Sequence, residues 1–318
     1  ARATLGCPGV SDRLETDPGK PERYGAVKHP YISAIYPLEG PDATRPAEAF
    51  VQQTGQNTGN LIFSASVLRL VDGLALPPSR ITDPQAVAAN CDGVVIAAAN
   101  WLQPSRDLAE MAAFLDALDK PVVVTGLGAQ ASAGRIPELP VGTIRFRQLV
   151  AERSHSISVR GACSAEGLDH YGVRDVAVTG CPSLLYHLSR PAQITHRPDP
   201  GAPLRVALNG GLPEARTPSR DSARKALGRF MLQEALRLEA PYVAQTELSL
   251  MHLARGGLAE DDAATWAFLA DACGTDDRAV MRTYAERHLQ VFGADRRHTA
   301  ARGDRGPSGR APRAAFDP

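Results

Sequence analysis

The sequence predicts an α/β protein made of two doubly wound parallel-sheet units, the second of which is incomplete. Over residues 49–291, short runs of apolar and β-branched residues alternate with segments of helical periodicity. Because parallel strands need a crossover between them, this alternation favours a parallel sheet covered by helices on both faces. The 318 residues suffice for two ordinary domains. Four prolines within residues 189–203 mark a linker between them.

The first unit is expected over residues 47–188, after an extended arm of residues 1–46. The arm is rich in Pro, Gly and charge and holds one short strand-like run at residues 31–36. The expected strands of the unit are apolar or β-branched runs at residues 49–53, 93–98, 121–125, 156–160 and 175–179. The expected helices follow them at residues 61–71, 106–118, 143–154 and 163–171.

The second unit is expected over residues 204–293 and shows only two clear strands, at residues 204–209 and 242–246. Its expected helices lie at residues 219–239, 248–254, 261–272 and 277–291. So few strands leave the later helices partly uncovered, which favours either association into an oligomer or instability. Residues 294–318 lack periodicity and hold almost no large apolar residue, so we expect a disordered tail. The abrupt loss of pattern also suggests a shifted reading frame as a hypothesis.

Charge and cysteine usage exclude several classes of protein. The chain has 35 Lys and Arg residues against 35 Asp and Glu, so its net charge does not favour a nucleic-acid partner. Its five cysteines are odd in number and form no C-x-x-C pair. They argue against a disulfide scaffold or a zinc site, and for a reducing, cytoplasmic compartment. No apolar run approaches the roughly 20 residues of a membrane helix, and no signal peptide is expected.

A strand that ends on arginine is the most informative feature of the first unit. The run Ile157-Ser158-Val159-Arg160 is followed by Gly161 and a helical stretch that begins Ala162-Cys163-Ser164. In an open parallel sheet, ligands bind at the C-terminal strand ends and the helix starts beyond them. A guanidinium there suits a carboxylate or phosphate, so Arg160 and Ser164 are predicted to line an anion site. The alternative is a structural ion pair of Arg160 with a carboxylate such as Glu166.

A second turn, Gly180-Cys181-Pro182-Ser183, follows the next expected strand and is predicted to face the same ligand. The alternative is a purely structural turn. Cys181 is a weak candidate nucleophile because nothing in the sequence supplies a base and buried cysteines are usually inert.

A glycine-rich loop follows the strand at residues 121–125. Its sequence, Gly126-Leu127-Gly128-Ala129-Gln130-Ala131, fits the outline of a dinucleotide fingerprint. The prolines that follow prevent a helix from opening inside the motif, and no acidic residue ends a following strand at the proper distance. We therefore expect no nucleotide cofactor, and predict a ligand loop in which Gly128 allows close approach and Gln130 supplies a polar contact.

Polar residues at two other turns are further candidates. In Asn57-Thr58-Gly59-Asn60, Asn60 could cap the next helix, or the segment could contact a ligand at a helix start. In the second unit, Asn209 and the segment Gln245-Thr246-Glu247 end strands and could face the first unit. Glu247 is either an acid or base or, more simply, a carboxylate that caps a helix.

Taken in chain order, these motifs resemble one family. The segments Asn57-x-Gly59-Asn60, Val122-to-Gln130, Ile157-to-Arg160 and Thr179-to-Leu184 have the order and spacing of the polysaccharide pyruvyl transferase family, over roughly residues 49–291. The segment Gln245-Thr246-Glu247 is similar to the second-domain portion of bacterial members.

The resemblance implies two Rossmann-like domains facing each other in a GT-B-like arrangement. It also implies transfer of a pyruvyl group from phosphoenolpyruvate to sugar hydroxyls in cell-surface or exopolysaccharide synthesis. Phosphoenolpyruvate is then the anionic donor substrate, a glycan is the acceptor, and no cofactor is needed. Arg160 resembles the strand-end arginine of the family, which implies donor binding and charge stabilisation.

The chain departs from the family pattern at two points. Ala97-Ala98-Ala99-Asn100 stands where members usually carry a glycine-rich turn, and no histidine precedes a glycine. The general acid of the Arg-x-His-Gly motif is therefore not carried over, and we expect a C-terminally truncated or frame-shifted member of doubtful activity. Two other hypotheses stay open: a GT-B-like glycosyltransferase that uses a nucleotide sugar, and a non-catalytic remnant that binds an anionic metabolite or a partner.

Overall fold

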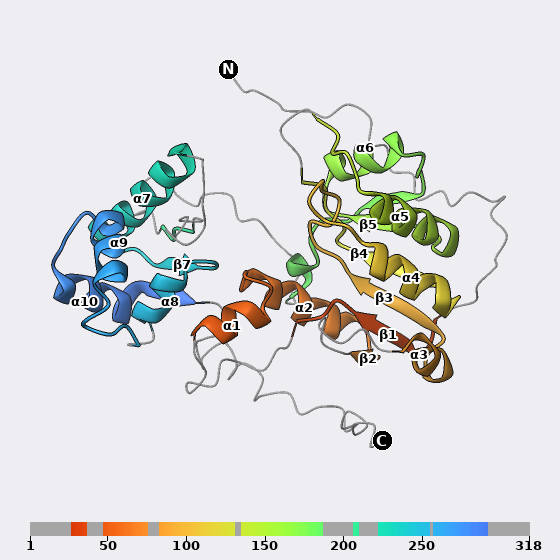
Figure 1. The fold of residues 1–318 in the computed structure, drawn as a ribbon, viewed down its shortest axis with the longest axis horizontal. Helices are drawn as coiled ribbons and strands as arrows, with labels where there is room; N and C mark the ends of the chain where they lie inside the picture. Colours follow the sequence, from red (N-terminus) through yellow and green to blue (C-terminus); the bar gives the residue numbers. More distant parts are fainter. Residues whose placement is uncertain are drawn as a thin grey trace, which may run out of the picture. The chain divides into compact units, whose positions relative to one another are not determined.

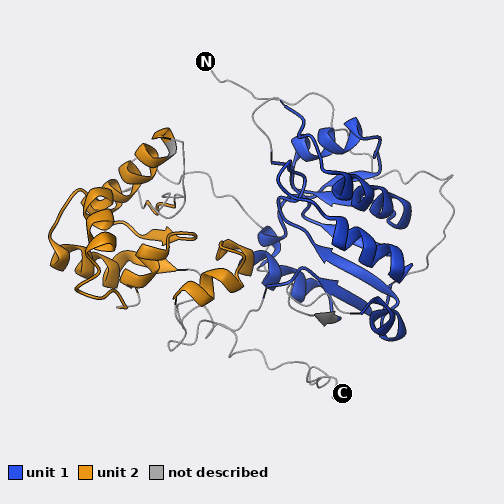
Figure 2. Ribbon diagram, viewed as in Figure 1, with its two compact units in different colours: residues 1–37, 62–194 blue, residues 38–61, 195–318 orange. Residues whose placement is uncertain are grey.

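The computed structural model describes residues 27–36, 47–75, 83–130, 135–186, 206–209, 222–254 and 257–291. They divide into two compact units (Figure 2). Of the described residues, unit 1 takes those up to 36 and those from 62 to 186, and unit 2 takes residues 47–61 and those from 206 onward. This grouping differs from the expected boundary at residue 47. Most of the expected arm, the linker and the tail lie outside the described residues.

Unit 1 is built on parallel strands in the order β2-β1-β3-β4 (Figure 1). A second parallel pair, β5-β6, is joined to them by a bridge between Leu127 and Val159. The strands are β1 (Pro30–Ser33), β2 (Leu74–Ala75), β3 (Gly93–Ala97), β4 (Val122–Thr125), β5 (Ile157–Val159) and β6 (Val176–Val178). The predicted α/β class with parallel sheets is therefore confirmed.

Strand β1 confirms the short strand expected at residues 31–36 within the N-terminal arm, and its pairing shows that this strand is central in the sheet. All four of its residues are buried, and it pairs with β2 on one side and β3 on the other. A proline is tolerated as the first residue of a strand because its missing N–H is lost only at the end of the ladder. The run Pro-Tyr-Ile-Ser is too short for its periodicity to reveal a central strand.

Helices cover the two faces of this sheet unequally. They are α2 (Gly59–Leu70), α3 (Pro84–Asn90), α4 (Ala109–Leu118), α5 (Val141–Arg153) and α6 (Ala162–His170). On one face, Val94 and Val122 pack with residues of α4 and α5. On the other, Val95 packs with Phe63 and Val67 of α2. Val123, which the register aligns with Val95, is 44% exposed, so within the described ranges this second face is covered only in part.

Unit 2 contains a small parallel sheet and five helices in its described part. Strands β7 (Tyr242–Ala244) and β8 (Leu289–Val291) pair in parallel, and Leu208 forms a parallel bridge to Tyr242 on β7. The helices are α1 (Ala47–Gln53), α7 (Ser222–Arg237), α8 (Leu248–Ala254), α9 (Ala263–Cys273) and α10 (Arg278–His288). The predicted bounds of α8 are confirmed.

Two elements of unit 2 correct the sequence prediction. Residues 49–53 belong to helix α1 and do not form a strand, since Ala47 and Phe50 share one buried face at helical spacing. The expected helix at residues 277–291 ends at His288 and continues as strand β8. Short apolar runs are ambiguous between helix and strand. Packing against α8 accompanies the helical form of residues 49–53, and pairing with β7 makes residues 289–291 a strand.

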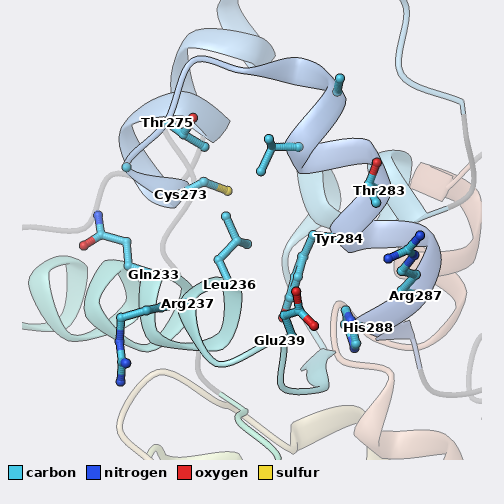
Figure 3. A pocket seen from close by; sticks show the side chains of 13 residues that line it. Gln233, Leu236, Arg237, Glu239, Cys273, Thr275, Thr283, Tyr284, Arg287 and His288 are labelled. Carbon is cyan, nitrogen blue, oxygen red and sulfur yellow. The ribbon is translucent and has the colours of Figure 1, made fainter.

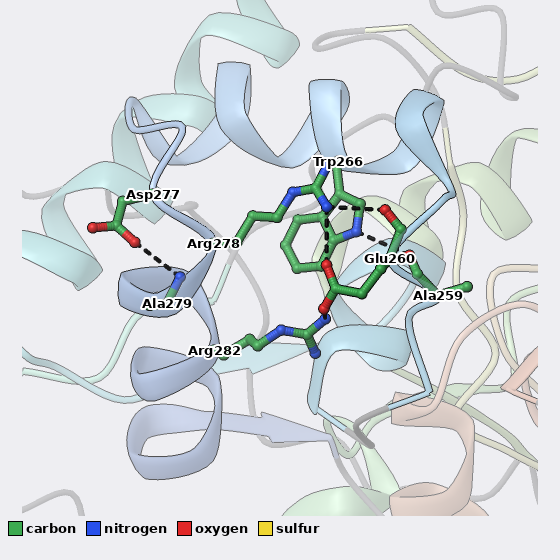
Figure 4. Close-up of polar contacts among 7 residues, drawn as sticks. All are labelled: Ala259, Glu260, Trp266, Asp277, Arg278, Ala279 and Arg282. Atoms are coloured by element: carbon green, nitrogen blue, oxygen red, sulfur yellow. Dashed lines mark hydrogen bonds and ion pairs between the residues drawn. The ribbon is translucent and has the colours of Figure 1, made fainter.

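A closed side-chain cluster ties α9 to α10 (Figure 4). The indole of Trp266 is buried, and the guanidinium carbons of Arg278 and Arg282 lie 4.7 and 4.8 Å from its centroid. Both arginines pair with Glu260, and the indole Nε1–H donates to the carbonyl of Ala259 over 2.9 Å. These groups satisfy one another, so the cluster is a structural clamp of unit 2.

Candidate functional site

The C-terminal edge of the unit 1 sheet brings together the loops that follow β3, β4 and β5. Because these strands are parallel, their C-terminal ends share one edge. The loops after β3 and β4 are joined by main-chain hydrogen bonds: Gly128 N donates to Ala99 O over 2.9 Å, and Leu102 N to Gly128 O over 3.0 Å. This ladder gives the edge a fixed backbone.

The side chain of Arg160 lies across these joined loops. Its Nε donates to the carbonyl of Gly126 over 2.7 Å, and its Nη1 donates to Oδ1 of Asn100 over 3.1 Å. A longer contact of 3.5 Å runs from Nη2 to the carbonyl of Ala98. All three acceptors are neutral, and no carboxylate among the described residues, Glu166 included, forms an ion pair with this half-buried cation.

An aromatic pair lies beneath the guanidinium. Its carbon is 5.8 Å from the ring centroid of Phe63, and the ring of Tyr36 meets Phe63 edge-on at 6.2 Å. Burial raises the pKa of the Tyr36 phenol, and the positive charge of Arg106 opposes that rise. The phenol is therefore protonated at neutral pH, so the edge carries two cationic residues and a neutral hydroxyl.

Two glycines allow the close packing at this edge. Gly126 has φ of +71°, and a Cβ there would lie 2.6 Å from the ring of Pro182. At Gly128 a Cβ would lie 2.6 Å from Oδ1 of Asn100 and 3.4 Å from Cδ of Arg160. The structure thus places Gly126 and Gly128 where the loop backbone and the Arg160 side chain approach each other.

The other predicted residues of unit 1 lie around the same edge with different exposures. Ser164 is buried, and its hydroxyl accepts from the N–H of Ala129 over 2.9 Å, so it anchors the glycine-rich loop. The side chain of Gln130 is exposed, and its backbone N–H donates to Leu102 O.

The turn after β6 packs against the loop after β4. Gly180 has φ of +84° and begins the turn. Pro182 is buried and starts a short 3₁₀ helix, Pro182–Leu185. Cys181 Sγ contacts Ser183 Oγ at 3.3 Å. A hydroxyl partner is no base, so this contact does not activate the thiol as a nucleophile.

A separate group of predicted residues meets in unit 2. The N–H of Thr58 donates to the carbonyl of Gln245 over 3.0 Å, and a Cβ on Gly59 would lie 3.6 Å from Nε2 of Gln245. The cap of α2 is formed by Asn57, whose Oδ1 accepts from Gly59 N over 2.8 Å. This corrects the expectation for Asn60, whose side chain donates to Thr54 O.

Glu247 is fully buried and serves the loop before α8. Its Oε2 accepts from the N–H groups of Gln245 and Thr246, each over 2.9 Å, and its Oε1 accepts from the Tyr242 hydroxyl over 3.2 Å. These three donors all precede α8 and none is an N–H of the helix, so this carboxylate fixes the loop and these contacts show no helix cap. Without solvent access it is also poorly placed for proton transfer. Asn209 is exposed and donates through Nδ2 to Val243 O over 2.6 Å.

Unit 2 also has a pocket of about 570 Å³ between α7 and α10 (Figure 3). Leu236, Cys273 and Tyr284 are among its lining residues, and none of the residues predicted from the sequence lines it. Burial raises the pKa of the Cys273 thiol to about 12, so this cysteine carries no nucleophilic chemistry at neutral pH. The guanidinium of Arg237, also at the pocket, is engaged by the Glu234 carboxylate.

Sequence reasoning missed two residues that complete the arginine site. Asn100 accepts from the guanidinium, and Phe63 lies beneath it. Asn100 follows β3 at its C-terminal end, so the argument applied to Arg160 could have found it. The sequence does not mark Phe63 in this way, because a phenylalanine in an apolar helix is equally typical of a hydrophobic core without any ligand site.

The part of the chain that the structure describes holds neither a candidate metal site nor a membrane-spanning helix. No group of three His, Cys, Asp or Glu residues there is placed to hold a metal ion. No helix in the same ranges combines the length and apolar character needed to cross a bilayer.

Comparison with known proteins gave one match. The family described as polysaccharide pyruvyl transferase matches residues 19–261, a span that includes every residue of the arginine site. Neither a curated protein nor a solved structure matches the chain.

Proposed function

Because the chain belongs to the polysaccharide pyruvyl transferase family, we propose that unit 1 binds phosphoenolpyruvate at Arg160 and that the protein transfers its pyruvyl group to a sugar. The observation that carries the proposal is the guanidinium at the C-terminal sheet edge, held by three neutral acceptors. A half-buried cation without a carboxylate partner among the described residues retains its charge for an incoming anion.

The donor and the site match in chemistry. Phosphoenolpyruvate carries a carboxylate and a phosphate, and both groups accept the parallel N–H bonds of a guanidinium. Nε of Arg160 is already engaged by Gly126 O, whereas Nη1 and Nη2 each have a second N–H. We assign these two N–H groups to one anionic group of the donor.

In the proposed reaction, C3 of phosphoenolpyruvate gains a proton and C2 becomes an oxocarbenium-like centre. Two sugar hydroxyls add to C2, lose their protons, and displace phosphate, which leaves a cyclic ketal. The guanidinium of Arg160 stabilises the negative charge that develops on the departing phosphate. The residue that donates the proton is not assigned.

Resemblance to the family supports two further elements of the proposal. Each unit is a Rossmann-like domain of the GT-B type, and the acceptor is a sugar of a cell-surface polysaccharide or exopolysaccharide. We place the reaction in the cytoplasm, which the free thiols of Cys91, Cys163, Cys181 and Cys273 support as residues typical of a reducing compartment.

The test is calorimetric titration of the chain with phosphoenolpyruvate, with UDP-glucose as the competing ligand class. Arg160→Met keeps the apolar stem and removes the charge, and should weaken binding about tenfold or more. Arg174→Ala is the matched control, because Arg174 precedes β6 at the opposite edge of the sheet and its side chain is 87% exposed.

Each outcome has a defined meaning. Equal affinity of wild type and a folded Arg160→Met variant would remove this site from the proposal. Binding of UDP-glucose in place of phosphoenolpyruvate would favour a glycosyltransferase. Binding of phosphoenolpyruvate without phosphate release, across a panel of acceptor glycans, would leave a binding protein and contradict the transfer step.

A further inference from the structure

We infer that Asn100 is a charge-preserving positioning residue, which holds Arg160 by an uncharged oxygen and thereby keeps the site selective for anions. The inference rests on the proposed function, because it concerns the same arginine. It adds a residue that was not among the predicted site residues and that lies in the Ala97-Ala98-Ala99-Asn100 turn, which departs from the family pattern.

The orientation of the Asn100 amide follows from hydrogen-bond chemistry. A guanidinium can only donate, so the atom that faces Nη1 of Arg160 at 3.1 Å must be the amide oxygen. The Nδ2 group of the same exposed side chain then offers two further N–H donors. An anion at Nη1 can therefore meet N–H groups from both side chains.

The backbone around Asn100 limits the freedom of this contact. Its carbonyl accepts from Nε2 of Gln103 over 2.9 Å, and the neighbouring Ala99 carbonyl accepts from Gly128 N. The missing Cβ of Gly128 leaves the space that Oδ1 of Asn100 fills. The two joined loops therefore hold the backbone of Asn100 in place, and its side-chain oxygen fills the space beside Gly128.

The electrostatic argument depends on the choice of Asn over Asp. The two side chains have nearly the same shape, but aspartate would bring a full negative charge to about 3 Å from the guanidinium. That charge would neutralise Arg160 and repel an incoming carboxylate or phosphate. An amide keeps the hydrogen bond and leaves the positive charge for the ligand.

The experiment compares Asn100→Asp with Asn100→Ala in the full chain, with phosphoenolpyruvate and inorganic phosphate as titrants. A merely structural role predicts that the isosteric Asp variant binds better than the Ala variant. Our inference predicts the reverse: Asn100→Asp loses about tenfold or more in affinity, and Asn100→Ala about two- to fivefold. The melting temperature of Asn100→Asp should equal or exceed that of wild type, because an ion pair replaces a neutral contact.

A control variant separates local charge from net charge. Asn90→Asp adds the same charge at the end of α3, where Asn90 donates to Ala86 O, and should leave anion affinity unchanged. Asn100→Asp that binds as well as Asn100→Ala, or better, would overturn the inference while the proposed function stands. A wild-type chain that binds neither titrant would overturn both.

Discussion

The Nε–H of Arg160 donates to the carbonyl oxygen of Gly126 over 2.7 Å, so the arginine at the end of β5 also holds the loop after β4. One residue therefore joins two neighbouring strand ends and carries the charge of the candidate site. This double role shapes what substitutions at the edge should do, because ligand affinity and fold stability change together unless the two are measured separately.

Arg160→Lys should reduce both stability and anion affinity. Lysine keeps the positive charge but cannot make the Nε contact to Gly126 and the Nη1 contact to Asn100 from one planar group. We expect a loss of roughly 1–3 kcal/mol in unfolding free energy and phosphoenolpyruvate affinity between those of wild type and Arg160→Met. Urea unfolding and calorimetry measure the two effects. An unchanged free energy of unfolding would contradict the role of Arg160 in holding the loop after β4.

Gly128→Ala should disturb the site through Asn100. The added Cβ would lie 2.6 Å from Oδ1 of Asn100 and 3.4 Å from Cδ of Arg160, so the amide has to move. We expect weaker phosphoenolpyruvate binding with a small change in melting temperature. Gly161→Ala is the control, because a Cβ at this neighbouring position meets nothing within 4 Å and its φ of −170° suits any residue. Equal affinity of both variants would argue against tight packing at Gly128.

Thr58→Val should leave unfolding free energy unchanged or raise it. The residue is fully buried, and its hydroxyl has no hydrogen-bond partner in the described part of the chain. Replacing an unpaired buried hydroxyl by a methyl group of the same shape removes a desolvation penalty of about 1–3 kcal/mol. Thr54→Val is the matched comparison and should destabilise unit 2, because Thr54 Oγ1 donates to Val51 O over 2.9 Å. Chemical denaturation of both variants tests whether their changes in the free energy of unfolding have opposite signs.

Thiol reactivity should separate the cysteines by burial. Cys163 is exposed and should react with iodoacetamide at pH 8, whereas the buried Cys273 should react only after unfolding. Burial raises the pKa of Cys273 to about 12 from its ordinary 9.0. Because the folded pKa is the higher one, the stability linked to this thiol is fully present below pH 9 and is lost as pH rises towards 12.

Mass spectrometry of the alkylated chain tests the first part of that prediction. The unfolding free energies of wild type and Cys273→Ala, compared at pH 8 and pH 10.5, test the second. The wild-type advantage should shrink at the higher pH. An early modification of Cys273 at pH 8 would show that the α9 end opens readily, against the burial described above.

The fold class and the position of Arg160 at a strand end could be predicted from the sequence, because both depend on local patterns of residues. Runs such as Val122–Thr125 and the valine-rich β3 are short, apolar and followed by glycine or small residues, and such runs are typical of buried parallel strands. Arg160 could be placed at the sheet edge because the run before it is three residues of strand and the helix after it starts at Ala162. These are local properties of the chain.

Contacts between distant segments could not be predicted in the same way. Helix α1 was expected as a strand. It packs on α8, where Glu48 Oε1 lies 2.8 Å from His252 Nε2, and its buried residues show the spacing of a helix. The sequence of α1 alone does not reveal this packing. Thr58 and Gln245 are far apart in sequence, yet the N–H of Thr58 donates to the carbonyl of Gln245. No periodicity encodes such a pair.

By itself, the sequence determined the α/β class, the position of Arg160 at a strand end, and membership in the pyruvyl transferase family, because strand patterns and ordered motifs are local. Tertiary structure decided that β1 is central and that residues 47–61 join unit 2. It also decided that Asn100, Gly126 and Ala98 supply only neutral acceptors to the guanidinium. The reason is that charge compensation depends on which loops meet in space, and residues separated by 34 or 60 positions meet only when the sheet forms.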